Sequence, residues 1–387
     1  MWPQRRVLLG SAAAALALAL AIGVYLLAPD RADDERASGP GATRAAGFFG
    51  VNAQALFDLS AGRVEAHLRV MADGGLELVR RDAPWNVAEP EPPEGGRHSY
   101  LWDSFDREVA AYARHGLRWL PIVDYSTAWS GEIAGDFFSA PARVGDYAAY
   151  AGALADRYGE GGSFWHQHPQ LPELPVTRFE IWNEPNAELF WHPTERAAER
   201  YAELYLAAHA AIRRADPSAR VLVGGLALGN QDVLDERDFI ETMVRHRPQL
   251  VDAADAIAFH PYAATADGVI ARIRDFRQTL ARLGLGQVPL EITEVGWTTT
   301  KTSETDRAQA LRQLAEQLPR SDCNIASLIP HTWLTHEQDP NNPEDWFGIY
   351  NPDATPKPSG SAYTTAVTHA RQATTQTQIN HCARAAS

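Results

Sequence analysis

Residues 178–225 contain the repeating unit on which the predicted fold rests. They begin with the apolar run RFEIWN at Arg178–Asn183, continue through a pattern of helical period at Glu195–Ala215, and end with the run RVLVGG at Arg220–Gly225. Short, mostly apolar runs are typical of strands that are buried on both faces, as in parallel sheets covered by helices. The segment therefore predicts a strand–helix–strand unit.

The same alternation extends in both directions along the chain. Strands are predicted at Phe48–Asn52, Leu76–Asp82, Arg118–Tyr125, Arg178–Asn183, Arg220–Gly225, Ala256–His260, Val288–Glu294 and Ile325–Trp333. Helices are predicted at Arg63–Asp73, Trp102–His115, Val144–Tyr158, Glu195–Ala215, Asp238–Val251, Gly268–Leu283, Asp306–Leu318 and Ser361–Gln372.

Eight strands that alternate with eight helices predict the α/β class, as a (β/α)8 TIM barrel that forms a single catalytic domain over residues 45–372. An open, doubly wound sheet would show the same alternation. However, no predicted strand leads into a G-x-G-x-x-G turn or a P-loop, which removes the commonest uses of that fold.

The N-terminus predicts export of the chain. Arg5 and Arg6 precede an unbroken apolar run, Val7–Ala28, that is long enough to cross a hydrocarbon core of roughly 30 Å. Residues 1–28 are interpreted as a membrane anchor or a cleaved signal peptide, residues 29–44 as a polar linker, and residues 373–387 as a C-terminal tail. Both interpretations of the leader predict an extracytoplasmic domain, which is secreted or anchored to the outer face of the cell membrane.

Composition and charge limit the partners. Hydrophobic residues make up 45% of the chain, which is enough for a large core. The net charge of −14 argues against nucleic acid, because neutralising phosphates requires clustered Lys and Arg. Membrane contact is expected only through the N-terminal segment, and the expected state is a monomer. Cys323 and Cys382 are predicted to form a disulfide in an oxidising compartment, the alternative being two unrelated thiols.

Two glutamates follow predicted strands in similar surroundings. Strand four ends in FEIWNEPN at Phe179–Asn186, and strand seven ends in LEITEVGW at Leu290–Trp297. Reactive residues of a (β/α)8 barrel come from the C-terminal ends of its strands, so Glu184 and Glu294 can face each other. Two carboxyl groups roughly 5–5.5 Å apart support glycoside hydrolysis by double displacement. The alternative is that they cap helices or form surface ion pairs.

The motifs around these glutamates resemble those of a known group of enzymes. The sequence IWNEPN at 181–186 resembles the acid/base signature of the clan of retaining glycoside hydrolases built on (β/α)8 barrels, and ITEVGW at 292–297 resembles its nucleophile signature. The sequences RRDAPW at 80–85 and RYG at 157–159, with GSFW at 162–165, are similar to glycoside hydrolase family 39. The resemblance covers about residues 47–365, although families 5 and 51 share the two Glu motifs.

The resemblance implies a retaining O-glycosyl hydrolase that acts on an extracytoplasmic oligo- or polysaccharide. Glu184 would be the acid/base and Glu294 the nucleophile. A catalytically inactive polysaccharide-binding or assembly factor is one alternative, and a transglycosylase with the same residues is another. The sugar, the linkage and exo or endo action stay open.

Other polar residues at strand ends complete the expected site. Asn183 would bind the sugar 2-hydroxyl, or else cap a local turn. Tyr262 would donate to the nucleophile, and Arg80 would lower its pKa or pair instead with Glu180. His260 would contact the sugar or support another side chain, with a purely structural role as the alternative.

Aromatic residues are expected to form the sugar subsites, because apolar sugar faces stack on aromatic rings. Trp333 on strand eight is the expected platform, and Trp85, Trp129 and Trp297 on loops would extend it. Several families of the clan carry a His on strand three, where this chain has Val123-Asp124-Tyr125, so Asp124 or Tyr125 is expected to bind substrate in its place.

No cofactor and no metal are expected. A metal-dependent hydrolase on the same fold would use histidines such as His260, His331 and His336. However, no H-x-H pair follows strand one, and no H-E-x-x-H motif occurs.

Overall fold

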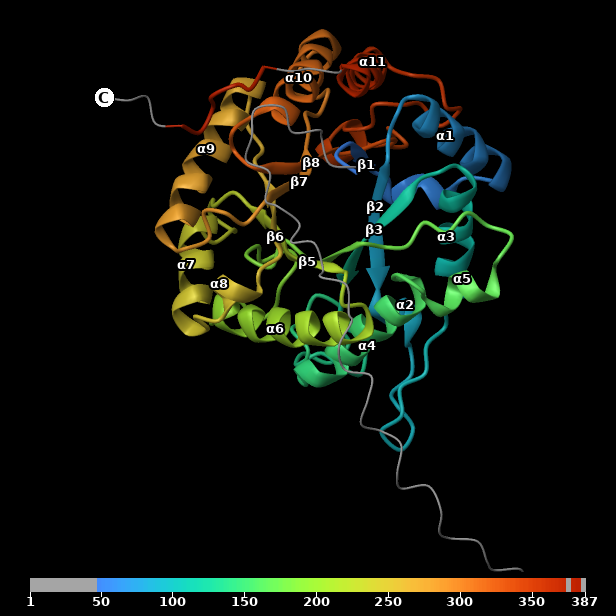
Figure 1. The fold of residues 1–387 in the computed structure, drawn as a ribbon, viewed down its shortest axis with the longest axis vertical. Helices are drawn as coiled ribbons and strands as arrows, with labels where there is room; N and C mark the ends of the chain where they lie inside the picture. The colour runs from blue at the N-terminus through green and yellow to red at the C-terminus, as the bar shows by residue number, and fades with distance from the viewer. Residues whose placement is uncertain (1–46, 374–376, 384–387) are drawn as a thin grey trace, which may run out of the picture. The chain divides into compact units, whose positions relative to one another are not determined.

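Eight parallel strands form a closed barrel in the computed structural model, which describes residues 47–373 and 377–383. The strands follow one another in the order β1-β2-β3-β4-β5-β6-β7-β8, and each is parallel to its neighbours. A parallel bridge between Phe49 and Leu328 joins the first and last strand segments and closes the ring. Figure 1 looks down this ring, with helices around its outside. The predicted (β/α)8 barrel is confirmed.

The strands lie close to their predicted positions. They are β1 (Gly50–Asn52), β2 (Leu78–Pro84), β3 (Arg118–Asp124), β4 (Arg178–Asn183), β5 (Arg220–Ala227), β6 (Ala256–His260), β7 (Leu290–Val295) and β8 (Ile325–Pro330).

Helices connect the strands and cover the outside of the barrel. Within the described residues, the α-helices are α1 (Ala61–Asp73), α2 (Trp85–Ala88), α3 (Asp103–Arg114), α4 (Val144–Tyr158), α5 (Ser163–Gln167), α6 (Ala197–Ala215), α7 (Glu236–His246), α8 (Leu250–Ala253), α9 (Ala266–Arg282), α10 (Glu304–Gln317) and α11 (Pro358–Gln372), and the short 3₁₀ segments are η1 (Gln54–Asp58), η2 (Leu318–Arg320) and η3 (Pro343–Trp346). The helix predicted at 238–251 is divided into α7 and α8, because Pro248 lies between them and lacks the N–H that a continuous helix needs.

The barrel interior combines a small apolar core with buried charged residues. A small inner core is formed by Leu78, Leu120, Leu222, Ala256, Ala258 and Ile329. Two residues further along β2 from Leu78 lies Arg80, which is fully buried and paired with Glu180 of β4. Alternate residues of a strand face the same side, so Asp82 and Asp124 also belong to the inward-facing rows. Buried polar groups therefore line the C-terminal ends of the strands, and a second buried ion pair, Arg178 with Glu291, lies near the N-terminal ends of β4 and β7.

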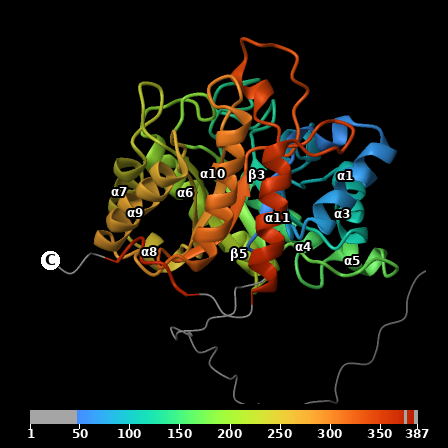
Figure 2. The same cartoon turned by 90° about the horizontal axis from the view of Figure 1, so that it is seen from above.

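The C-terminal part of the chain is tied to the barrel. Helices α10 and α11 lie side by side on its outside (Figure 2). The segment 377–383 then pairs with the chain ahead of β8, through a parallel bridge between Ser321 and Ile379 and a disulfide between Cys323 and Cys382. The predicted disulfide is confirmed.

The predicted leader at residues 1–28 and linker at 29–44 lie outside the described residues. Within residues 47–373 and 377–383, no helix has the length and apolar character needed to cross a bilayer.

Candidate active site

The end of β4 departs from regular strand geometry. Trp182 and Glu184 have positive φ values of 67° and 44°, a region that costs a non-glycine residue roughly 1–2 kcal/mol. The irregular backbone places the Trp182 ring in the outer core, where its Nε1–H donates to the carbonyl of Phe190. Asn183 faces Arg80 inside the barrel. Strain at such positions is characteristic of functional sites.

Glu294 at the end of β7 is surrounded by donors. Its Oε1 accepts from Arg80 Nη1 at 2.6 Å and from Asn52 Nδ2 at 3.2 Å, and its Oε2 accepts from the hydroxyl of Tyr262 at 3.0 Å. Burial alone would raise the pKa of Glu294, but the nearby His260, His331 and Arg80 outweigh it and hold the pKa well below its ordinary value. This carboxyl group is therefore held in its ionised form.

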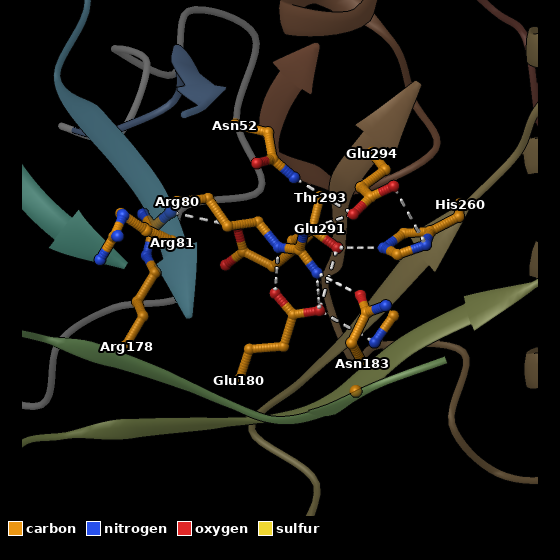
Figure 3. A network of polar contacts seen from close by, with 12 residues as sticks. Asn52, Arg80, Arg81, Arg178, Glu180, Asn183, His260, Glu291, Thr293 and Glu294 are labelled. Carbon is orange, nitrogen blue, oxygen red and sulfur yellow. Dashed lines mark hydrogen bonds and ion pairs between the residues drawn. The ribbon is translucent and has the colours of Figure 1, made fainter. Parts of the chain in front are cut away.

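Arg80 connects the nucleophile candidate to β4 (Figure 3). Its Nε and Nη2 donate to the two oxygens of Glu180 at 2.8 Å each, and Nη2 also donates to Asn183 Oδ1 at 2.9 Å. The sequence left open whether Arg80 serves Glu294 or pairs with Glu180. It does both, because the planar guanidinium presents donors on two sides.

Glu184 has different surroundings. Its Oε1 lies 2.7 Å from His260 Nδ1, and His260 Nε2 lies 3.1 Å from the hydroxyl of Thr293. That hydroxyl donates to a Glu180 oxygen at 3.3 Å, so its lone pairs face the imidazole and favour a proton on Nε2. His260 Nδ1 therefore lies within hydrogen-bond distance of the Glu184 carboxyl group and can share a proton with it.

The two glutamates form a close pair. One carboxylate oxygen of Glu184, one of Glu294 and a ring nitrogen of His260 lie within 4.8 Å of one another. Three such groups could in principle surround a cation. However, the donors on Glu294 already include a guanidinium at 2.6 Å, which would repel a cation. The cluster is therefore better described as two carboxyl groups that share an imidazole neighbour than as a cation site.

Solved glycoside hydrolases have the same fold. The chain aligns with a family 39 glycoside hydrolase from the gut symbiont Bacteroides cellulosilyticus WH2 at a TM-score of 0.64 and 20% identity, over 85% of this chain and 64% of that one. It aligns with a monomeric β-xylosidase from Caulobacter crescentus CB15 at a TM-score of 0.62 and 20% identity, over 84% and 69% of the two chains. The chain has the fold of the family 39 hydrolases.

The family 39-like barrel is also similar to a glucosidase from Croceicoccus marinus, with a TM-score of 0.64 and 17% identity over 85% of this chain and 69% of that one. The chain spans 64% of the length of the Bacteroides enzyme, so the likeness concerns the barrel alone. No protein-family model and no curated protein matches the sequence.

The expected aromatic subsites need correction. Trp333 and Trp85 of the family 39-like barrel are fully buried, so neither presents a ring face to a sugar in this structure. Trp333 stacks on Tyr350 with ring centroids 3.8 Å apart, and its Nε1–H donates to His67. Both rings are held by core packing, which a strand-end position alone does not reveal.

The remaining predicted contacts differ in their exposure. Trp297 is also buried, and its Nε1–H donates to the carbonyl of Ala263. Trp129 is half-buried and packs against the ring of Trp85. Its Nε1–H donates to the carbonyl of Glu89. Asp124 is fully buried, and neither of its carboxylate oxygens has a hydrogen-bond partner. Trp129 therefore has the most accessible ring of the predicted subsite tryptophans.

Two residues to which the sequence assigned no role beside Glu294 approach it in the structure. Asn52 ends β1 and donates to its carboxylate, and His331 follows β8 with Nδ1 3.7 Å from Glu294 Oε2. The rule that polar residues at strand ends form the site would have found both. At strand eight the same rule also points to Trp333, and sequence alone does not decide between the two residues.

Proposed function

We propose that this protein is a retaining O-glycosyl hydrolase, with Glu184 as the general acid/base and Glu294 as the nucleophile. The observation that carries the proposal is the approach of their carboxylate oxygens to within 4.8 Å at the C-terminal ends of β4 and β7. Retaining enzymes separate these groups by roughly 5–5.5 Å, whereas inverting enzymes leave room for a water between them. The surroundings differ as well: three donors stabilise the charged form of Glu294, whereas Glu184 faces the imidazole of His260.

The first step forms a covalent intermediate. A Glu294 oxygen attacks the anomeric carbon while Glu184 gives its proton to the glycosidic oxygen, so that the C–O bond breaks and the alcohol leaves. An ester between the sugar and Glu294 remains. His260 keeps Glu184 in position through the 2.7 Å contact.

The second step reverses these roles. Glu184, now a carboxylate, removes a proton from water, and the water oxygen attacks the anomeric carbon. The ester bond breaks and Glu294 regains its negative charge, which Arg80, Asn52 and Tyr262 stabilise through hydrogen bonds. Two displacements return the original anomeric configuration.

Asn183 is proposed to bind the sugar 2-hydroxyl. Its Oδ1 is occupied by the 2.9 Å bond from Arg80, which leaves the NH₂ group of the amide free to donate. Hydrogen bonds to this hydroxyl strengthen in the transition state of glycoside hydrolysis.

The proposed substrate is an oligo- or polysaccharide outside the cytoplasm. Two structural neighbours are described as a β-xylosidase and a glucosidase, and the apolar run at residues 7–28 supports export of the domain. One neighbour is described as monomeric, and a monomer is proposed here too.

The test is a panel of aryl glycosides and polysaccharides with the purified full-length chain, followed by Glu294→Ala and Glu184→Ala on the substrate that is cleaved. Both variants should lose hydrolysis of poor leaving groups, while Glu184→Ala should keep rapid glycosylation by dinitrophenyl glycosides, which need no acid. Azide should restore turnover in both. The Glu294→Ala product should have inverted configuration, and the Glu184→Ala product should have retained configuration.

Glu188→Ala is the matched control, because Glu188 is an exposed glutamate on the same loop, four residues after Glu184. It should keep full activity. Azide products of the opposite configurations would reverse the two roles. A folded wild type that binds a polysaccharide and cleaves none of the panel would favour a binding factor instead.

A further inference from the structure

His331 lies between the proposed nucleophile and a surface carboxylate. Its Nδ1 is 3.7 Å from Glu294 Oε2, and its Nε2 is 3.3 Å from Glu344 Oε2. The ring packs edge-to-face on Phe347 with centroids 5.1 Å apart, and the backbone N–H donates to the carbonyl of Val295 at 2.9 Å. The imidazole is thus held by the Phe347 ring, by the contact with Glu344 and at its backbone.

The two ends of this ring differ in exposure. The side chain of His331 is 18% exposed and that of Glu344 is 69% exposed, whereas the side chain of Glu294 is 13% exposed. His331 Nδ1 is buried and makes no hydrogen bond. At 3.7 Å it interacts with Glu294 through charge, because the distance is too long for a hydrogen bond.

We propose that His331 is a positioning residue for Glu294: paired with Glu344, its imidazolium holds the nucleophile ionised and ready for attack. The inference rests on the function proposed above and adds a residue to it. Tyr262 already donates to the same Oε2, and His331 approaches that oxygen from β8. Glu344 supplies the counter-charge that lets a partly buried imidazole keep its proton.

The charges around His331 agree with this role. Burial lowers the pKa of His331, but Glu294 and Glu344 outweigh burial and the repulsion from Arg80, so the pKa is raised above 6.5. The titratable groups that face the ring or its partner carboxylate are Glu294 of β7, Glu344 of η3, Arg80 of β2, and His260 and Tyr262 at the end of β6. Two carboxylates thus lie directly at the ring nitrogens.

Kinetics give the first test. On the glycoside that the wild type cleaves, kcat/KM is measured against pH for the wild type, His331→Gln and Glu344→Gln. Loss of the imidazolium should move the acidic limb upward by about 1 pH unit, because an opposite charge at this range shifts a carboxyl pKa by at least that much. Glu344→Gln should move it in the same direction by less, and 0.5 M salt should reduce that difference because Glu344 is exposed.

Glu65→Gln is the control, since it breaks another His–Glu pair, with His115 at 2.6 Å, away from the site residues. It should leave the profile unchanged. A lower kcat in His331→Gln and Glu344→Gln with an unmoved acidic limb would overturn the proposal and leave His331 a structural role only.

A second measurement does not depend on glycoside hydrolysis. The His331 imidazole signal is assigned by its absence in His331→Gln, and its NMR titration is compared in the wild type, Glu294→Gln and Glu344→Gln. The midpoint should lie above 6.5 in the wild type and fall in both variants. If it falls but no glycoside is ever cleaved, the ion pair stands and the proposed function fails. If it does not move in Glu294→Gln, the coupling to Glu294 is wrong.

Discussion

Glu294 accepts three hydrogen bonds on two oxygens, whereas Glu184 contacts a single imidazole. Each donor on Glu294 stabilises the carboxylate more than the neutral acid, and Arg80 adds a full positive charge. Glu184 has instead one side-chain partner, the His260 ring nitrogen at 2.7 Å. Two identical side chains therefore have different chemistry because of the atoms within about 3 Å of them.

Tyr262→Phe tests the donors around the nucleophile. The variant removes the 3.0 Å bond to Glu294 Oε2 and leaves the ring in place, so we expect kcat to fall by about 10²-fold, as when one donor to a developing charge is lost. In the wild type the lowered pKa of Glu294 should keep the nucleophile active well into the acidic range, and in the variant the acidic limb of kcat/KM should move upward. Initial rates between pH 3 and 9 measure both effects, and an unchanged rate with an unchanged limb would remove Tyr262 from the site.

Asp82→Asn tests a buried acid beside the site. Burial, opposed by Arg80 and by the bond from Gln54, raises the pKa of Asp82 from 3.8 to about 6. Its folded pKa is above its unfolded value, so its contribution to stability is complete below pH 3.8 and is lost as the pH rises through about 6.

The variant lacks this titration. Its free energy of unfolding relative to the wild type should therefore increase between pH 4 and pH 7.5, by at most about 3 kcal/mol at 1.36 kcal/mol per pKa unit. Urea denaturation at the two pH values measures the change, with the exposed Asp58→Asn as the control. An equal difference at both pH values would show that Asp82 titrates normally.

At the scale of elements, neighbouring strands fit around the imidazole of His260. A Cβ added at Gly225 of β5 would lie 2.0 Å from His260 Nε2 and 2.5 Å from Cε1, so this position requires glycine for a close approach. The Gly225 N–H also donates to Glu180 at 3.0 Å. Strand β5 thus determines where the partner of Glu184 can stand.

Gly225→Ala should displace His260 and lower kcat, because Glu184 would lose its 2.7 Å partner. Overpacking of this kind costs about 1–3 kcal/mol of stability. The control is Gly62→Ala in α1, where nothing lies within 4 Å of the added Cβ and the helix should gain about 0.5–1 kcal/mol. Thermal denaturation and activity measure both variants, and full activity in Gly225→Ala would show that the position of His260 is not critical.

At the scale of the whole molecule, a disulfide links the C-terminal tail to the segment before β8, at the end of the barrel opposite the two glutamates. The disulfide between Cys323 and Cys382 encloses a chain separation of 59 residues that includes all of α11. Asp322 reinforces it by accepting the backbone N–H groups of residues 381–383 at 2.7 Å each. The link stabilises the last β/α unit without touching the site.

Cys323→Ser with Cys382→Ser should therefore lower the free energy of unfolding by about 2–4 kcal/mol while kcat at 25 °C stays the same. Calorimetry and steady-state kinetics measure the two quantities. A reducing agent should lower the Tm of the wild type to that of the double variant and leave the variant unchanged. Loss of activity in the folded variant would mean that the tail influences the site.

Much of the architecture follows from local sequence pattern. The strands β4 and β6 have the predicted bounds, because each is an apolar run that ends in polar residues. The positions of Glu184 and Glu294 were predictable for the same reason, since residues that follow parallel strands gather at one end of a barrel. The disulfide was predicted from two cysteines in a chain expected to be exported.

The sequence alone determined the barrel and the two glutamates, because strand periodicity and strand-end position are local properties that a single chain displays in order. Only the tertiary structure decided which side chains contact one another at the ends of the strands. Trp333 is buried on Tyr350, and His331 lies beside Glu294 instead. These outcomes depend on the register between β7 and β8 and on side-chain packing around the ring. Such contacts join residues of different strands and loops, and no local pattern specifies them.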